Sequence, residues 1–154
     1  MTLFRAATDD DLLAIVRLQA EDTVPPGREL TAEPLDPRYV HAFGAIARDP
    51  NQLLVVAEDG GEVVGTLQLT FIPGLAFRGA WRGQIESVRV ASPLRNRGIG
   101  EALIRWAVER CRERGCRMVQ LTSTNSRTDA HRFYGRLGFV GSHTGFKLLL
   151  EESE

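Results

Sequence analysis

The chain has 154 residues, of which 43% are hydrophobic and 25% are charged, a composition typical of one globular domain with a buried core. Lysine and arginine number 19 against 20 aspartate and glutamate residues, so the formal net charge is −1 and no overall field favours nucleic acid or an anionic membrane. No apolar run is long enough to cross a bilayer, and no leader-like pattern opens the chain. We therefore expect a single domain over residues 1–154 in the cytoplasm, with no nucleic-acid or membrane partner.

The first half of the chain is predicted to contain a strand, two helices and a hairpin. Thr8 has the character of an N-cap, and apolar residues then recur at helical spacing as far as Ala20. Gly60 and Gly61 separate two apolar runs and tolerate the positive φ of a tight turn. The predicted elements are a strand over 3–7, a helix over 9–20, a helix over 37–48, and hairpin strands over 53–57 and 63–72.

Two connections in this half lack a regular pattern. Prolines interrupt residues 21–37, which predicts a long loop. Its acidic residues have two interpretations: solvated charge, or an acidic wall that attracts a cationic amine. Residues 75–83 form the second connection, which would line a pocket or contact another subunit.

The second half alternates strands and helices. Ile85, Val88 and Val90 mark a strand that Pro93 ends, and a helix with one apolar face begins near Ile99. A strand placed directly after a helix favours a parallel crossover. The remaining elements are a strand over 118–122, a helix over 129–138 and a last strand over 146–150. The predicted fold class is α/β: a mixed, mostly antiparallel sheet flanked by helices, with one parallel βαβ unit.

An arginine- and glycine-rich turn precedes the helix that begins at Ile99. The first N–H groups of a helix lack intrahelical partners and carry partial positive charge, so they attract phosphate. Gly98 and Gly100 would let a diphosphate approach the backbone, and Arg95 and Arg97 would add charge beside it. An ordinary helix start with surface arginines is the alternative. The patterns of nucleotide triphosphatases and dinucleotide-binding enzymes are absent.

Cysteine and histidine offer no further chemistry. Cys111 and Cys116 fit neither a metal-ligand pattern nor a disulfide framework, so two unpaired thiols and no metal are expected. No nucleophile and base are paired by spacing.

Two motifs together resemble the GNAT superfamily of N-acetyltransferases. The first is Arg95-x-x-Gly98-x-Gly100 after an apolar strand, and the second is Ala130-x-x-Phe133-Tyr134-x-x-x-Gly138-Phe139. They lie in the segment from Ile85 to Phe139. The resemblance implies the GNAT fold, acetyl-CoA as cosubstrate and an amine as acetyl acceptor.

The resemblance also assigns roles to individual positions. Glu86 matches the carboxylate that acts as base in some members, with Gln84, acting through ordered water, as its rival. Tyr134 matches the tyrosine that faces the CoA sulfur. The implied cofactor-binding residues are Val88, Val90, Arg95, Asn96, Arg97, Gly98, Ile99, Gly100 and Asn125.

One position departs from the family pattern. Many members have an asparagine that contacts CoA several residues before the Ala-x-x-Phe-Tyr motif. Arg127 lies three residues before Ala130 here, and the nearest asparagine is Asn125. Either residue is a candidate for this contact.

Two functions remain open at this stage. One is an N-acetyltransferase that acts on a primary amine of a small molecule, peptide or protein by direct attack in a ternary complex. The other is a non-catalytic acyl-CoA-binding sensor or interaction module. The presence of both Glu86 and Tyr134 favours the enzyme. The acceptor and the oligomeric state, monomer or homodimer, are left open.

Overall fold

The computed structural model describes residues 1–21, 23 and 25–151, which fall into two compact units, Met1–Leu121 and Thr122–Glu154. The second unit holds one helix, α5 (Thr128–Arg136). The elements of the first unit are β1 (Thr2–Ala6), η1 (Asp9–Asp11), α1 (Leu12–Ala20), α2 (Pro37–Arg48), β2 (Gln52–Asp59), β3 (Glu62–Ile72), α3 (Ala76–Gly79), β4 (Arg82–Val90), η2 (Ser92–Leu94), α4 (Ile99–Glu113) and β5 (Met118–Leu121).

Within the described residues, the strands form one sheet in the order β1-β2-β3-β4-β5. The first four strands pair antiparallel, whereas β5 pairs parallel to β4. The parallel pair follows from the α4 crossover, because parallel neighbours need a long connection. The predicted α/β class, with its hairpin and single parallel βαβ unit, is confirmed.

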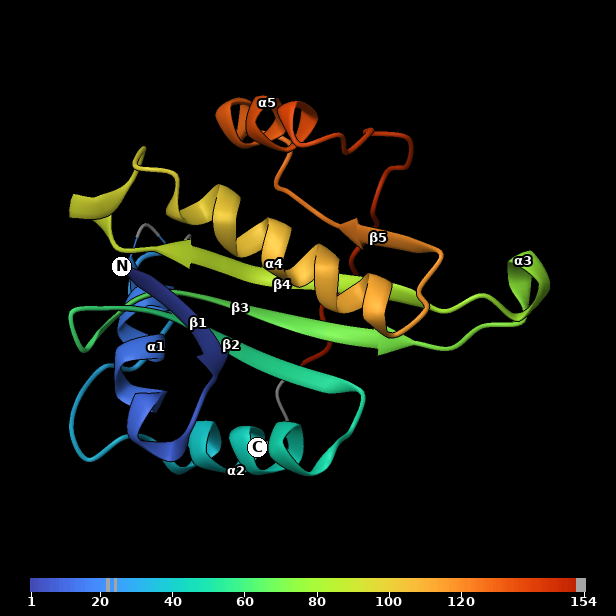
Figure 1. The fold of residues 1–154 in the computed structure, drawn as a ribbon. Coiled ribbons are helices and arrows are strands. Elements are labelled where there is room, and N and C mark those ends of the chain that lie inside the picture. Colours follow the sequence, from blue (N-terminus) through green and yellow to red (C-terminus); the bar gives the residue numbers. More distant parts are fainter. Residues whose placement is uncertain (22, 24, 152–154) are drawn as a thin grey trace. The chain divides into compact units, whose positions relative to one another are not determined.

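Helices cover both faces of this sheet (Figure 1): α4 contacts β1, β3, β4 and β5, and α1 and α2 lie on the other face. The α4 contact is close at Gly83, where a Cβ would lie 2.3 Å from the Cys111 sulfur. Burial raises the pKa of the Cys111 thiol to about 12. Both cysteines are free thiols, as expected.

The predicted elements need few corrections. The first helix begins with a 3₁₀ turn, η1, before the α-helix starts at Leu12. The last predicted strand, 146–150, is wrong: the described residues from Phe139 to Glu151 contain no regular element. The apolar run Leu148–Leu150 has strand propensity, but a strand also needs a hydrogen-bonded neighbour. No described helix is both long and apolar enough to span a membrane.

Asp11 is a buried carboxylate in a partly buried ion pair that the sequence pattern did not reveal. Its carboxylate accepts hydrogen bonds from Arg5 at 2.7 and 3.0 Å and from the Thr8 N–H at 2.7 Å. Arg5 also contacts Glu58 at 3.3 Å. The hydrogen bond from Arg5, helped by the Thr8 N–H, holds the pKa of Asp11 below its ordinary value although burial acts to raise it.

We expect Asp11→Asn to lower the free energy of unfolding by about 1–3 kcal/mol at pH 7. A lowered folded-state pKa stabilises above the unfolded-state pKa, near 3.9, and this stabilisation is lost as pH falls through the folded-state value. The difference from wild type should therefore shrink as the pH falls below about 4. Urea denaturation across this range measures it, with the exposed Asp10→Asn as control. A difference that does not vary with pH would contradict the ion-pair account.

Candidate active site

The strand β4 loses its parallel neighbour halfway along its length. Its pairing with β5 covers only the residues from Arg82 to Ile85. Directly beyond, Ser87 has φ 54° and the β3–β4 register shifts, which is a β-bulge. From Glu86 to Val90, β4 therefore has an open edge on its β5 side within the described sheet.

The backbones of Val88 and Val90 face this open edge. The Ala91 N–H donates to Val64 O on β3 at 2.9 Å, and backbone groups alternate between the two sides of a strand. Two arginines hold the carbonyls at the open edge: Arg89 Nη1 lies 2.9 Å from Val88 O, and Arg95 Nε lies 3.1 Å from Val90 O. An extended ligand arm could pair here like an added strand.

The turn after β4 leads into the N-terminus of α4. Asn96 has φ 64° and the N-cap Gly98 has φ 84°, a left-handed conformation that glycine adopts without strain. The first helical hydrogen bond runs from Ala102 N to Gly98 O at 3.0 Å. The N–H groups of Ile99, Gly100 and Glu101 therefore precede the helical ladder, which leaves them available to an anion.

Glu21 ties the 21–37 loop to this turn. Its carboxylate accepts hydrogen bonds from the Ser92 N–H at 3.2 Å and the Ser92 hydroxyl at 2.9 Å, and it contacts Arg95 at 3.5 Å. Sequence reasoning missed this contact, because the two segments are some 70 positions apart.

The other described acidic residues of the loop also have basic or backbone partners. Glu29 accepts hydrogen bonds from Arg28 at 2.7 Å and from the Tyr39 hydroxyl at 2.9 Å. Burial acts to raise the pKa of Glu29, but Arg28, Tyr39 and the charge of Arg89 outweigh it and lower the pKa. The same burial and the Glu29 carboxylate raise the pKa of Tyr39. Two further contacts complete the set: Glu33 with Arg17, and Asp36 with Arg38.

Glu21 and Glu29 connect the loop to other segments, through Ser92 and Tyr39. Of the predicted acidic residues, Asp22 lies outside the described residues. Glu33 is exposed, as the interpretation of solvated charge predicts, whereas Glu21, Glu29 and Asp36 are partly buried in contacts within the chain.

Glu86 lies exposed on β4, opposite Gln68 of β3. Gln84 lies on the same face of β4, because side chains alternate along a strand. It is half-buried, and its amide oxygen accepts a hydrogen bond from Gln120 at 2.7 Å. The two candidates for the base are therefore adjacent on one face, with Glu86 at the start of the open edge.

Tyr134 belongs to the second unit. On α5, its half-buried ring contacts Phe133 edge-on, with the ring centroids 5.2 Å apart, and Phe139 with the centroids 5.9 Å apart. The two candidates for the CoA contact lie just before this helix: Arg127 is its N-cap, and Asn125 is exposed.

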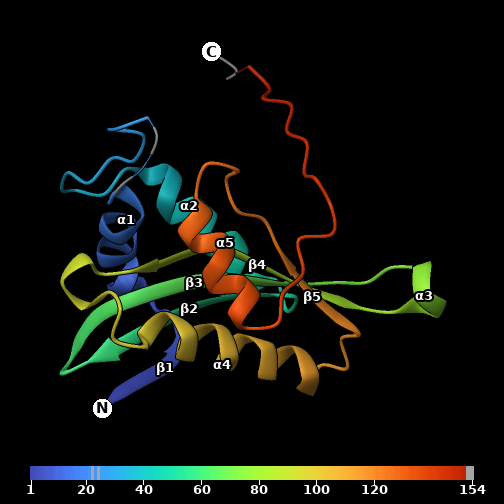
Figure 2. The ribbon, with the colours of Figure 1, turned by 90° about the horizontal axis from the view of Figure 1, so that it is seen from above.

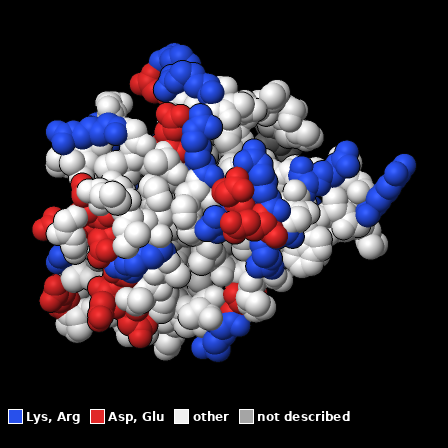
Figure 3. Space-filling model, viewed as in Figure 1, with Lys and Arg blue, Asp and Glu red and all other residues white. Residues whose placement is uncertain are grey.

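The connection between β3 and β4 carries the short α3 and extends beyond the end of the sheet (Figure 2). Phe77 and Arg78, with Arg117, line a hollow of about 320 Å³. The connection thus borders a hollow, and its predicted role as a pocket wall or a subunit contact stays a prediction. Figure 3 shows basic side chains gathered at this end of the molecule.

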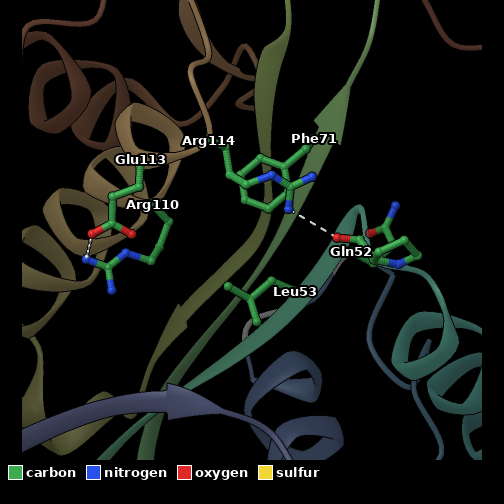
Figure 4. Close-up of a pocket in the computed structure, with 7 residues that line it drawn as sticks. Gln52, Leu53, Phe71, Arg110, Glu113 and Arg114 are labelled. Atoms are coloured by element: carbon green, nitrogen blue, oxygen red, sulfur yellow. Dashed lines mark hydrogen bonds and ion pairs between the residues drawn. The ribbon is translucent and has the colours of Figure 1, made fainter.

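A second pocket, of about 220 Å³, lies between α4 and the start of β2 (Figure 4). Arg114 crosses it: the guanidinium donates to Pro50 O at 3.1 Å and to the Asn51 side chain at 2.7 Å, and it stacks 4.1 Å from the Phe71 ring centroid. These contacts attach the C-terminus of α4 to the sheet. The pocket lies on the α4 face, whereas Glu86 lies on the opposite one.

Comparison with known proteins agrees with this geometry. The model of the acetyltransferase (GNAT) family matches residues 10–139. An aminoalkylphosphonate N-acetyltransferase of Salmonella typhimurium is 38% identical over 104 residues, which are 68% of this chain and 67% of that protein.

Solved structures extend the likeness over nearly the whole chain. The crystal structure of a transcriptional regulator from Bacillus halodurans has a TM-score of 0.94 and 46% identity, covering 97% of this chain and 100% of that one. An acetyltransferase of Clostridium acetobutylicum solved with acetyl-CoA has a TM-score of 0.75, covering 97% of this chain and 96% of that one, but at 18% identity it shows the fold alone.

The chain therefore belongs to the GNAT acetyltransferase family. It is an acetyl-CoA-dependent N-acetyltransferase, which moves an acetyl group from acetyl-CoA to an amine.

Proposed function

We propose that the acceptor is a primary amine of a small molecule, peptide or protein, and that it attacks acetyl-CoA directly in a ternary complex. The observation that carries this proposal is the open edge of β4, which leads straight into the N-terminus of α4. An extended pantetheine arm would pair with Val88 and Val90, while the diphosphate would meet residues 95–100. This arrangement brings two substrates together without a covalent enzyme intermediate.

Two side chains then carry the proton transfers. Glu86, directly or through a water held by Gln84, takes a proton from the acceptor ammonium, because only a neutral amine is a nucleophile. The amine nitrogen bonds to the thioester carbonyl carbon and the carbon–sulfur bond breaks. The Tyr134 hydroxyl gives a proton or a hydrogen bond to the departing thiolate. In the same proposal, Asn125 or Arg127 contacts CoA.

A second candidate function is a non-catalytic acyl-CoA sensor. The observation in its favour is the likeness to the Bacillus halodurans protein, a transcriptional regulator that is 46% identical to this chain. The exposed carboxylate of Glu86 at the open edge favours turnover. Incubation with acetyl-CoA and a panel of amines and peptides, read by mass shift, separates the two candidates: a sensor binds acetyl-CoA but gives no acetylated product.

Acetyl-CoA should stabilise the fold against heat. At a concentration a hundredfold above Kd, binding adds about 2.7 kcal/mol to the free energy of unfolding, or about 5–10 °C in the Tm of a domain this size. Gly100→Val should abolish most of this shift, because its side chain would occupy the approach to the α4 N–H groups. Thermal melting with and without acetyl-CoA measures it.

The control is Glu109→Val, a β-branched substitution at an exposed position farther along α4, which should keep the full shift. If saturating acetyl-CoA did not change the Tm of the wild-type protein, the proposed diphosphate site at residues 95–100 would be contradicted. Equal shifts in wild type and Gly100→Val would place the diphosphate elsewhere.

A further inference from the structure

A continuous row of uncharged polar side chains crosses four strands of the sheet. Gln52 of β2 lies directly opposite Thr70 of β3, Thr70 opposite Gln84 of β4, and Gln84 opposite Gln120 of β5. Directly opposite residues project from the same face. With strands about 4.8 Å apart, the row is about 14 Å long.

Hydrogen bonds fix parts of this row. Gln52 Oε1 accepts from the Thr70 hydroxyl and from Gln68 Nε2, each at 2.9 Å. Gln84 Oε1 accepts from Gln120 Nε2 at 2.7 Å. Within the described chain, none of these bonds uses Gln52 Nε2, Gln68 Oε1 or Gln120 Oε1, so both donors and acceptors remain for a ligand.

The row is not part of the hydrophobic core. The core on this face consists of Ile15, Leu54 and Val56, with Phe43 and Ile46 packed against it. Gln52, Thr70 and Gln84 are half-buried and Gln120 is exposed. The cross-strand hydrogen bonds align these polar groups on one partly exposed surface, which suits a polar ligand.

The row lies next to the proposed base, Glu86, along the direction of β4. Glu86 follows Gln84 by two residues on the same face, a distance of about 6.6 Å along the strand. A molecule lying on the row could therefore place an amine at Glu86. Two cations share this face of β4 with Glu86: Arg89 lies past Glu86, away from the row, and Arg82 lies at the other end, about 13 Å from Glu86 along the strand.

We propose that the Gln52–Thr70–Gln84–Gln120 row binds the body of the acetyl acceptor, and that this acceptor is an amine carrying uncharged hydroxyl or amide groups. The inference rests on the proposed function. Carboxamides and hydroxyls pair with such groups as both donors and acceptors. A compact anionic amine is disfavoured, because its anion would lie over an uncharged row beside the Glu86 carboxylate and short of Arg82.

Three probes test the class of acceptor: glucosamine, its 6-phosphate, and cyclohexylamine, which has the amine but no hydroxyl group. With kcat/KM calculated on the neutral amine, since the basicity of the probes differs, we expect glucosamine to have the highest value, by about tenfold over cyclohexylamine, because two or more neutral hydrogen bonds are gained. A higher value for cyclohexylamine or for the 6-phosphate would overturn the proposal.

Two variants test the row itself. Thr70→Val and Gln120→Met each remove one polar group at nearly constant volume, and each should lower kcat/KM for glucosamine by about 2- to 10-fold. The values for cyclohexylamine and the Tm shift with acetyl-CoA should not change. Thr2→Val, on β1 at the far edge of the sheet, is the matched control. Equal losses for both amines, or no loss, would overturn the assignment.

Failure of the proposed function gives a different result. If no probe is acetylated although acetyl-CoA raises the Tm, turnover of these three amines is refuted and the row is tested by binding alone. Calorimetric titration of glucosamine into the CoA-saturated protein should then give a Kd that Gln120→Met raises about 2- to 10-fold. Absence of binding, or a Kd unaffected by that substitution, would refute the row as well.

Discussion

Replacing Glu86 by glutamine is expected to lower kcat by about 10²–10⁴-fold, the usual contribution of a general base. Glu86 stands at the start of the open edge of β4, and its side chain is exposed. The substitution keeps size and hydrogen-bonding capacity but removes the proton acceptor. Affinity for acetyl-CoA should therefore be retained. Steady-state kinetics, with calorimetric titration of acetyl-CoA on the same preparation, measures both quantities.

The pH dependence identifies the step that Glu86 assists. A base that deprotonates the amine matters less as pH rises toward the pKa of the acceptor, so the defect of Glu86→Gln should shrink in alkaline solution. Glu62→Gln, an exposed carboxylate at the far end of β3, is the control and should have wild-type rates. Near-normal activity of Glu86→Gln would transfer the role to water held by Gln84, which Gln84→Met would then test.

The fold was largely predictable because its signals are local. Helical periodicity before Ala20 and after Ile99, glycines at the β2–β3 turn and Pro93 after β4 each act within a few residues. The parallel pairing of β5 then follows from chain order alone, since a strand, helix and strand in succession make a crossover. The strand at 146–150 failed because its propensity is local but its partner is not.

Only the parts of the candidate site that consist of consecutive residues in a sequence motif could be predicted. The Gly98 and Gly100 turn could be found from the sequence because its chemistry belongs to consecutive backbone groups. The bulge at Ser87 could not, since no glycine marks its positive φ of 54°. The Glu21 contact with Ser92 and the alignment of Gln52 with Gln120 depend on register between distant strands and loops. Such pairings have no signal in one sequence.

Tyr134→Phe is expected to lower kcat by about 10²-fold or more while acetyl-CoA affinity barely changes. If the hydroxyl protonates or hydrogen-bonds the departing thiolate, its contribution arises in the transition state and is absent from the ground-state complex. The aromatic contacts with Phe133 and Phe139 involve the ring alone, so folding should survive. Steady-state kinetics beside calorimetric titration of acetyl-CoA measures the two effects separately.

Tyr39→Phe is the matched control, because it removes the other tyrosine hydroxyl of the chain. That hydroxyl donates to Glu29 at 2.9 Å and accepts from the Leu30 N–H at 2.9 Å. Its loss should lower the Tm modestly, since it removes both hydrogen bonds, one of them to the partly buried Glu29 carboxylate, and should affect kcat much less. The same pattern in Tyr134→Phe, a lowered Tm with kcat unchanged, would reduce Tyr134 to a packing residue and leave the thiolate to be protonated by solvent.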